Sequence, residues 1–381
     1  LIQPSDSIDV VADYRNGIRK MSDSNEMADN EITLDQRVVA TYTAPAKFEW
    51  PSIRASEAGL DESRLKDAAE YASANGSDSL LVLRNGQCVF EQYWNGKTAD
   101  DLQQTYSGTK SLFSLLVGRC IEAGYIQGLD QSVRDFVPEI PEEQVQITFG
   151  NALAMMSGME HSFRIESNIT TGISQMENAL HRVIVAPPMT QYHYNNSAYR
   201  LLFFALERAS GKNLDDLTKE QIFEPLAFNG ACWVHLFIQQ NGGERFGGYQ
   251  SIRMTPTDFA KSAQIILDNG QWQGETFVSA DYAKALVTAS NPDANPSFGL
   301  FHHLNAGDHF RGYIKPVVID RKLIPGAPDD LFLMYGNGGQ ITVGVPSLGL
   351  VIVRTGVEAV SLYEPNSVVE GVVRRACDAV C

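Results

Sequence analysis

The sequence predicts an α+β fold, in which helices flank one antiparallel sheet built from both ends of the chain and a helical domain is inserted. Three β-rich runs lie near the C-terminus, at residues 331–335, 340–345 and 350–355. An apolar hairpin pattern lies much earlier, at residues 80–90. Because the stretch between them, about 107–253, is mostly helical and loop-rich in pattern, the sheet is expected to join distant segments.

The individual elements follow from local signals. A helix is predicted through residues 61–65, before the hairpin. Asn85-Gly86 separates the two apolar runs of the hairpin and accepts the positive φ values of a type I′ turn. The apolar period of residues 201–209 predicts a helix that ends at Gly211. A last helix is expected from about residue 365 to 381, with Asn366 or Ser367 as its N-cap.

These elements divide the chain into three parts. Residues 1–49 lack a packed pattern and are expected to form an N-terminal extension. Residues 50–105 and 255–381 are expected to form a discontinuous α/β domain. Residues 106–254 are expected to form a mainly helical domain.

Composition and charge narrow the class of protein. The 381 residues include 30 Lys and Arg against 46 Asp and Glu, a formal net charge of −16. No nucleic-acid partner is expected, because nucleic acids recruit basic patches. No apolar run approaches the roughly 20 residues that span a bilayer, so no membrane span is expected. The chain begins with Leu1 rather than Met and holds five cysteines; we expect a processed periplasmic or secreted protein, with a cytoplasmic one as the alternative.

The segment Tyr106-Ser107-Gly108-Thr109-Lys110 contains a candidate nucleophile and a candidate base. Apolar residues recur at helical spacing from Leu112 onward, so Ser107 is expected near a helix N-terminus with Lys110 one turn further on the same face. A serine hydroxyl becomes an effective nucleophile when an adjacent base takes its proton, and a lysine buried on an apolar helix can act as that base. In isolation, the same spacing is also typical of a capping serine followed by a solvated lysine.

A second segment precedes the helix predicted at residues 201–209. Its sequence is Tyr192-His193-Tyr194-Asn195-Asn196. The phenol of Tyr194 is a candidate proton shuttle to a leaving group, and the amide of Asn196 is a candidate ligand for a substrate carbonyl. Alone, this pattern is also typical of a surface turn.

A third segment, Tyr335-Gly336-Asn337-Gly338-Gly339-Gln340, leads into a predicted strand. Small residues here allow the backbone to come close to a ligand. The amide of Gln340 is a candidate partner for the amide of Ser107 in an oxyanion hole. A glycine-rich turn before a strand is the structural alternative.

With these three segments in this order, the sequence resembles the serine β-lactamase-like superfamily, in its class C β-lactamase and family VIII carboxylesterase branch. It is also similar to the 6-aminohexanoate-dimer hydrolases. The resemblance runs from about Trp50 to the C-terminus and includes segments outside the candidate site. They are Ile147–Met159, Glu224-Pro225-Leu226 and Met254–Gly270.

The resemblance implies a β-lactamase/transpeptidase-like fold with the site between the two domains. It implies that Ser107 is the nucleophile, Lys110 its base partner and Tyr194 the general acid/base, and that Asn196 orients the substrate. It implies no metal and no organic cofactor. His302, His303 and His309 lack the carboxylate or cysteine spacing of a metal site, and we interpret them as loop residues.

One position departs from the family pattern. Asn337-Gly338-Gly339 falls where the family has Lys-Thr-Gly or His-x-Gly, so a neutral amide replaces a cation that helps to hold a substrate carboxylate. This change favours esters or amides without an anionic group over β-lactam antibiotics, unless Arg311 or Lys315 supplies the charge. The class A Ser-Asp-Asn element is also absent, so Glu166 is interpreted as a surface residue.

These observations predict a serine hydrolase that cleaves a carboxylic ester through an acyl-enzyme at Ser107, with a small-molecule ester or amide as its partner. One alternative is an amide or β-lactam hydrolase that resembles the 6-aminohexanoate-oligomer hydrolases or the D-amino-acid peptidases. Another is an acyltransferase that uses an alcohol in place of water. The last is a penicillin-binding-like sensor that is acylated without turnover.

Overall fold

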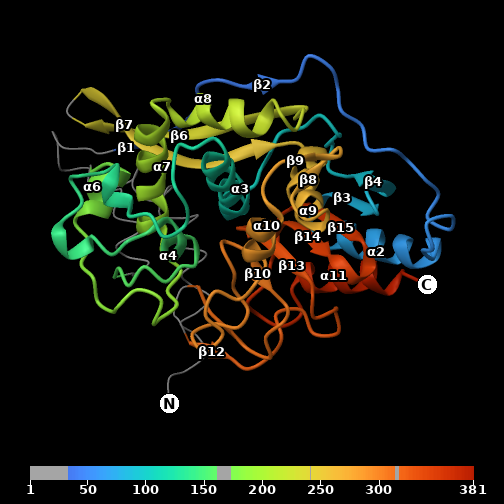
Figure 1. The fold of residues 1–381 in the computed structure, drawn as a ribbon. Helices are drawn as coiled ribbons and strands as arrows, with labels where there is room; N and C mark the ends of the chain where they lie inside the picture. The colour runs from blue at the N-terminus through green and yellow to red at the C-terminus, as the bar shows by residue number, and fades with distance from the viewer. Residues whose placement is uncertain (1–32, 161–172, 241, 314–316) are drawn as a thin grey trace, which may run out of the picture.

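The computed structural model describes residues 33–160, 173–240, 242–313 and 317–381. Most of the predicted N-terminal extension therefore lies outside the described residues, as do Glu166 and Lys315. The described chain contains two main antiparallel sheets with helices between and around them (Figure 1). None of its helices is long and apolar enough to cross a bilayer.

The larger sheet joins strands from both ends of the chain, as the sequence predicts. Its order is β10-β13-β14-β15-β3-β4, with antiparallel pairing throughout. Asn85 and Gly86 have φ values of 50° and 73°, so the turn between β3 and β4 has the expected positive φ values. The strands are β3 (Ser77–Arg84), β4 (Gln87–Tyr93), β10 (His303–Leu304), β13 (Phe332–Gly336), β14 (Gln340–Val345) and β15 (Leu350–Gly356).

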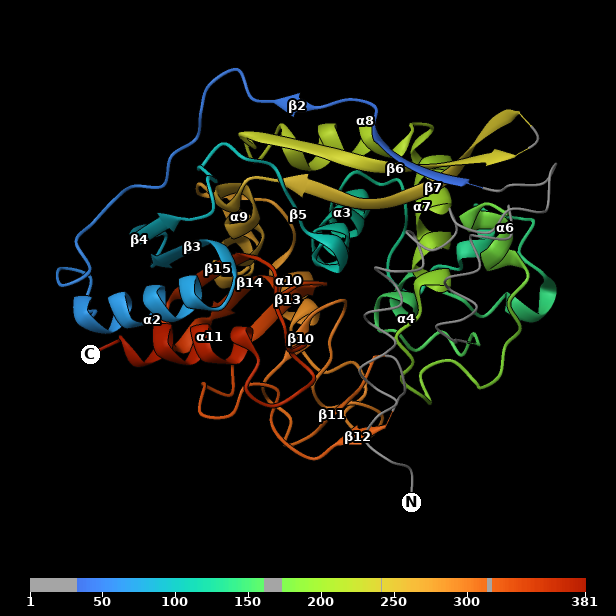
Figure 2. The same cartoon turned by 180° about the vertical axis from the view of Figure 1, so that it is seen from behind.

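Helices cover both faces of this sheet (Figure 2). Helices α2 (Glu62–Ala74) and α11 (Val368–Asp378) pack together on one face, and α9 (Pro256–Leu267) packs on the other. Leu80 and Val82 of β3 join the core beneath α2 and α11, whereas Leu81 and Leu83 join the core that contains α9. A strand buried on both faces has a continuous apolar run rather than an alternating one.

The second sheet was not predicted. Its order is β1-β6-β7-β5, and β2 also pairs with β6. It includes residues 230–240 and 243–254, which fall within the segment expected to be mainly helical but form two long paired strands. Most of β6 is buried on both faces, so periodicity could not distinguish it from a buried helix. The strands are β1 (Thr33–Val38), β2 (Tyr42–Thr43), β5 (Gln103–Gln104), β6 (Gly230–Gln240) and β7 (Gly243–Met254).

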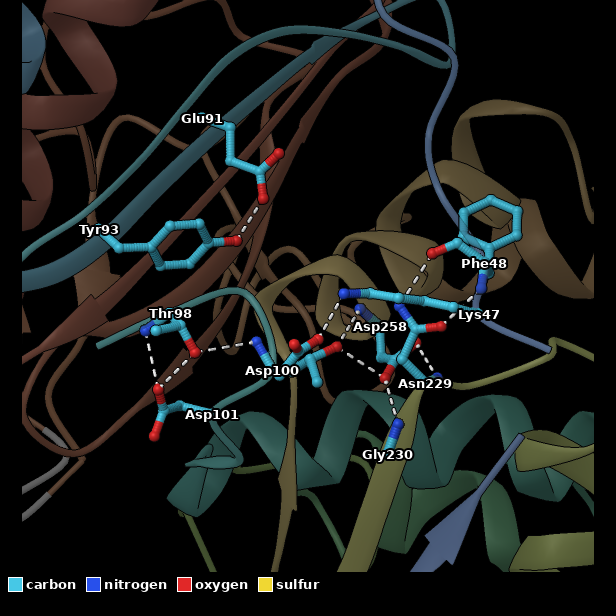
Figure 3. A network of polar contacts seen from close by, with 11 residues as sticks. Lys47, Phe48, Glu91, Tyr93, Thr98, Asp100, Asp101, Asn229, Gly230 and Asp258 are labelled. Carbon is cyan, nitrogen blue, oxygen red and sulfur yellow. Dashed lines mark hydrogen bonds and ion pairs between the residues drawn. The ribbon is translucent and has the colours of Figure 1, made fainter. Parts of the chain in front are cut away.

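The described part of the N-terminal segment is joined to the folded domains. Besides the pairing of β1 and β2 with β6, the backbone N–H of Phe48 donates to Oδ1 of Asn229 at 2.7 Å, and Nδ2 of Asn229 donates to the Phe48 carbonyl at 2.9 Å (Figure 3). Nζ of Lys47 lies 2.6 Å from Oδ1 of Asp100. Residues 33–49 are therefore part of the fold and not a free extension.

The remaining helices lie mainly between β5 and β6 in the sequence. Helix α7 ends at Gly211, which has a left-handed φ of 71°, and Ser367 is the N-cap of α11, both as predicted. The α-helices are α3 (Thr109–Glu122), α4 (Phe149–Leu153), α6 (Gln175–Leu180), α7 (Asn196–Ser210), α8 (Leu214–Thr218) and α10 (Ala280–Leu286).

Short elements complete the chain. One of them, the 3₁₀ turn η2, contacts β7 of the second sheet and both β13 and β14 of the larger sheet. This junction between the sheets is where Ser107 lies. The short helices are η2 (Tyr106–Gly108), η3 (Val133–Asp135), η4 (Glu142–Gln144), η6 (Lys219–Phe223) and η7 (Pro346–Leu348). The short strands are β8 (Gln271–Trp272), β9 (Glu275–Thr276), β11 (Phe310–Arg311) and β12 (Val318–Ile319).

Candidate active site

Ser107 lies in the turn η2, directly between strand β5 and helix α3. Two threonines anchor this turn to β7: Oγ1 of Thr105 donates to the Ile252 carbonyl at 2.8 Å, and the Ile252 N–H donates to Oγ1 of Thr109 at 2.8 Å. Tyr106 has a φ of 47°, an uncommon value for a residue with a side chain. The turn therefore holds Ser107 half-buried at the N-terminal end of α3, where the helix dipole favours a developing negative charge.

The end of β13 approaches this turn very closely. A Cβ atom at Gly336 would lie 1.9 Å from the carbonyl oxygen of Thr105 and 3.1 Å from the amide nitrogen of Gly108. A Cβ atom at Gly108 would lie 2.9 Å from the ring of Phe259 in α9. Glycine is therefore required at both positions, and the backbone of β13 lies next to the nucleophile turn.

Lys110 reaches back from the first turn of α3 to Ser107. Its Nζ donates to Oγ of Ser107 at 3.0 Å, and the residue is only 6% exposed. The rings of Tyr194 and Tyr199 lie 5.0 and 4.8 Å from the same nitrogen. The structure thus brings together the serine, the lysine and the tyrosine that the sequence analysis selected.

Tyr194 is positioned by the loop that precedes α7. The next residue, Asn195, caps this helix by accepting from the Ala198 N–H at 3.0 Å, and its Nδ2 donates to the Met159 carbonyl at 3.1 Å. Tyr194 itself is 9% exposed, and its ring packs edge-on against Tyr313 at 6.0 Å. Its orientation therefore depends on a helix cap and on aromatic packing.

Asn196 is the first residue of α7 and is half-buried. Its place two residues after Tyr194 brings it to the same helix end, as the turn pattern predicts. The helix-capping role, however, belongs to its neighbour Asn195. The use of Asn196 in orienting a substrate stays a prediction.

The predicted glycine segment is divided between two environments. Asn337 is exposed at the tip of the turn between β13 and β14. Gln340 instead faces the sheet: its Oε1 accepts from the Gly356 N–H at 3.0 Å, and its Nε2 donates to the Gly356 carbonyl. Cβ atoms at Gly338 and Gly339 would meet the side chains of Gln340, Arg354 and Glu358, and not the nucleophile turn. Gly336, which precedes the predicted triplet, is the residue that the structure places against η2.

Several site residues were not selected from the sequence. His303 of β10 is buried, and burial, the neighbouring His302 and the charge of Lys110 lower its pKa to about 3, so its imidazole is neutral. The pKa of His302 is lowered to about 4 by burial. His302 lies in a loop, as we expected, and His303 begins strand β10, but both are buried in the core. Among the described residues, no group of three or more His, Cys, Asp or Glu side chains is arranged to hold a metal ion.

A row of tyrosine rings extends from Tyr194 toward the glycine turn, the turn of residues 336–340 between β13 and β14. The ring of Tyr313 lies 5.0 Å from that of Tyr363 in a tilted arrangement, and Tyr363 lies 5.7 Å from Tyr335 on β13. The hydroxyl of Tyr363 is 3.3 Å from Nε2 of His303. Tyr335 belongs to the glycine segment that the sequence analysis selected, but no local motif marks Tyr313 or Tyr363, which come from separate loops. Their aromatic side chains are the only sequence signal that could have selected them.

The charged alternatives to Asn337 are placed only in part. Nε of Arg311 donates to the Ala294 carbonyl at 2.6 Å, so the loop backbone holds one end of this guanidinium. Lys315 lies outside the described residues.

The five cysteines are free thiols, four of them buried and Cys381 exposed.

Comparison with known proteins agrees with this architecture. A beta-lactamase family model matches residues 65–354. The 6-aminohexanoate-dimer hydrolase of Paenarthrobacter ureafaciens is 22% identical over 269 residues, which cover 65% of this chain and 66% of the relative. The chain thus spans just under two thirds of that relative's length.

Two solved structures share the fold at low sequence identity. A Bacillus anthracis protein, named as a proposed 6-aminohexanoate-dimer hydrolase, has a TM-score of 0.63 at 17% identity and covers 91% of this chain and 89% of its own. EstCE1, described as a hydrolase with promiscuous acyltransferase activity, has a TM-score of 0.59 at 14% identity, with 84% and 97% covered. Because the family model covers most of its length, this chain belongs to the beta-lactamase family and has the β-lactamase/transpeptidase-like fold.

Proposed function

We propose that this protein is a serine hydrolase that cleaves a carboxylic ester through an acyl-enzyme at Ser107. The observation that carries the proposal is the 3.0 Å hydrogen bond between Nζ of a buried Lys110 and Oγ of Ser107. Nucleophilic catalysis by serine requires a proton acceptor within hydrogen-bond reach of the hydroxyl. Tyr194, whose ring lies 5.0 Å from the same Nζ, completes the set of proton-transfer groups.

The proton of Ser107 first passes to the Lys110–Tyr194 pair as Oγ attacks the ester carbonyl carbon. The tetrahedral oxyanion then collapses, the bond to the leaving alkoxide breaks, and the pair returns the proton so that an alcohol departs. In the second half, the pair takes a proton from water, which attacks the acyl carbon. The carboxylic acid is released and Oγ of Ser107 recovers its proton, so water is the only co-reactant.

The oxyanion is assigned to two backbone N–H groups, those of Ser107 and Asn337. The carbonyl of Gly336 accepts from the Gly339 N–H at 3.1 Å, inside the turn. Since the two ends of a trans peptide point in opposite directions, the N–H of Asn337 points out of the turn. Gly336 itself lies against Thr105 and Gly108. The second donor is therefore assigned to Asn337 in place of Gln340, which was expected.

The substrate class follows from the charge at the turn. Asn337 is neutral where β-lactamase relatives carry a cation, so the site offers no direct ionic partner for a substrate carboxylate there. A neutral ester does not need one. This supports ester hydrolysis over β-lactam hydrolysis.

A second candidate is hydrolysis of a short amide. It is favoured by the similarity to the 6-aminohexanoate-dimer hydrolase of Paenarthrobacter ureafaciens. The same residues can perform this reaction, with the leaving amine taking the proton that an alkoxide would take. Rates on matched esters and amides distinguish the two candidates.

The proposal is tested with a fluorophosphonate probe and a substrate panel. The probe should label the wild-type protein at one site, and Ser107→Ala should abolish labelling while the thermal unfolding temperature stays close to that of the wild type. The panel contains p-nitrophenyl esters, short amides and a chromogenic cephalosporin. Labelling that persists in Ser107→Ala disproves the nucleophile, and a burst of acylation without steady turnover identifies a penicillin-binding-like sensor.

A further inference from the structure

We propose that Arg354 and Glu358 are positioning residues for the turn that presents Gly336 and Asn337 to Ser107, and that a negative charge on Glu358 slows acylation. The inference rests on the proposed function, because it concerns the same oxyanion site. Neither residue touches the reacting atoms in this assignment. Both act through the backbone of the turn.

Arg354 binds the turn from behind. It lies on β15 with no exposed surface, and its Nη1 donates to the carbonyls of Gly338 at 2.7 Å and Gly339 at 2.9 Å. Its other donors bind Oγ of Ser77 and the carbonyls of Gly76 and Val357. The guanidinium therefore fixes two consecutive carbonyls of the turn in a geometry that a lysine cannot reproduce.

Glu358 contacts the same turn from the segment after β15. A Cβ atom at Gly339 would lie 2.9 Å from its Oε2. Its Oε1 accepts from the hydroxyl of Tyr335, the residue before Gly336. Oε2 is buried and has no hydrogen-bond partner among the described residues. One carboxyl group thus lies against both ends of the segment that carries the proposed oxyanion donor.

The groups that face Glu358 come from several elements. Tyr335 faces it from β13 and Arg354 from β15. Burial and the charge of Glu358 raise the pKa of Tyr313. The hydroxyl of Ser361 lies 3.2 Å from the Tyr335 hydroxyl. Burial raises the pKa of Glu358 to about 7, against the opposing effects of Tyr335 and Arg354. Burial and the charge of Glu358 raise the pKa of Tyr335 well above its usual range, so Tyr335 stays protonated.

Glu358 is therefore the member of this cluster that changes charge near neutral pH. Arg354, whose pKa burial lowers to about 10, stays a cation in the same range. When Glu358 is neutral, one of the two carboxylate charges that act on Arg354, the other being Asp78, is removed, so the cation behind the turn favours an oxyanion more strongly. When Glu358 is ionised, its charge opposes the oxyanion.

The test compares Glu358→Gln with the wild type. The second-order rate of labelling by a neutral fluorophosphonate is measured from about pH 5.5 to about pH 8.5, on either side of the carboxyl pKa. The rate of the variant is divided by that of the wild type, so that pH effects common to the two proteins cancel. The ratio should rise from about 1 to roughly three- to tenfold, with its midpoint near pH 7.

Glu207→Gln is the matched control. Glu207 of α7 is likewise a partly buried carboxylate whose pKa burial raises, and it also accepts from a tyrosine, with the Tyr249 hydroxyl at 2.6 Å. Among the described residues, none of its hydrogen bonds goes to the turn between β13 and β14. Its rate ratio should stay flat with pH. An equal rise in both variants, or a flat ratio for Glu358→Gln, overturns the role of Glu358.

Arg354→Lys tests the other half of the inference. It keeps the charge and loses the three-nitrogen guanidinium, which binds the turn through Nη1 and the neighbouring segments through Nε and Nη2. It should slow labelling about tenfold or more at every pH. A wild-type rate overturns the positioning role, and if this variant does not fold by circular dichroism, Glu358→Gln decides alone. Failure of the proposed function is read separately, from persistent labelling of Ser107→Ala.

Discussion

Two buried lysines, Lys110 of α3 and Lys261 of α9, occupy similar local settings. Each lies three residues after an oxygen-bearing side chain near the start of its helix, with Ser107 and Asp258 as the partners. Each also packs against two aromatic rings, at 5.0 and 4.8 Å for Lys110 and at 4.2 and 5.2 Å for Lys261. They are 6% and 0% exposed.

The partner's chemistry separates them. Nζ of Lys261 binds Oδ1 of Asp258 at 2.8 Å and the Ala227 carbonyl at 2.7 Å. Asp258 also accepts the backbone N–H groups of Asn229 and Gly230, as Figure 3 shows. Burial lowers the pKa of Lys261, and Asp258 opposes this effect. This lysine therefore belongs to a structural ion pair that joins α9 to the start of β6.

The bond from Lys110 to Ser107 goes to a hydroxyl group, which carries no charge to balance an ammonium group. A hydroxyl can instead exchange a proton with an amine. The comparison teaches that a three-residue spacing and packing against aromatic rings are enough to bury a lysine next to an oxygen-bearing side chain. The residue one turn earlier decides whether the pair is suited to structure or to proton transfer.

The largest expected effect concerns the proton-transfer pair. Lys110→Ala and Tyr194→Phe should each lower kcat by roughly 10²–10⁴ in a steady-state esterase assay, as for general acid/base groups. Because the two groups act as a unit, the double variant should be little slower than the slower single variant. Strictly multiplicative losses would place the two residues in separate steps. Thermal unfolding serves as the control for folding.

The ion pair should respond in stability rather than in rate. Asp258→Asn leaves Lys261 buried without its carboxylate and should lower the free energy of unfolding by about 3–5 kcal/mol, measured by urea titration. The labelling rate of the folded protein should stay near the wild-type value. Replacing Lys261 by Met in the same chain should restore much of the lost stability. A loss in Asp258→Asn below about 1 kcal/mol would contradict a structural role.

Glu358 extends the comparison to a partly buried acid. Its pKa is raised by burial to about 7, so the folded protein binds this proton more tightly than the unfolded chain. The resulting stability is complete below the ordinary carboxyl pKa and is lost as pH rises through about 7. Between these limits the free energy of unfolding should fall by about 1–3 kcal/mol relative to Glu358→Gln. Parallel stability curves for the two proteins would show that Glu358 does not titrate in this range.

The smallest effect concerns the missing cation at the turn. Asn337 is exposed, so a lysine fits there without entering the core. Asn337→Lys should raise kcat/KM for an anionic cephalosporin about ten- to thirtyfold more than for p-nitrophenyl acetate, or roughly 1–2 kcal/mol. Equal changes for the two substrates would refute this argument and leave the fold assignment intact.

Part of the fold and the site could be predicted because the signals are local. The Asn85-Gly86 turn, the Ser367 cap and the Gly211 helix end each depend on the φ values or hydrogen bonds of a few neighbouring residues. The long strand β6 was missed because burial on both faces removes the alternation that marks a strand. Strand β7 shows no alternation either, because its first four residues are all exposed and most of the following ones are buried.

The sequence by itself determined the pairing of Ser107 with Lys110, because residues three apart meet on one turn of a helix whatever packs around it. Only the tertiary structure decided which glycine approaches the nucleophile. The contact of Gly336 with Thr105 joins distant segments, and its closeness depends on how η2 is anchored to β7. The same packing turned Gln340 toward Gly356 and placed Arg354 and Glu358 behind the turn. Contacts between distant segments are set by the packing of whole layers, which no local pattern encodes.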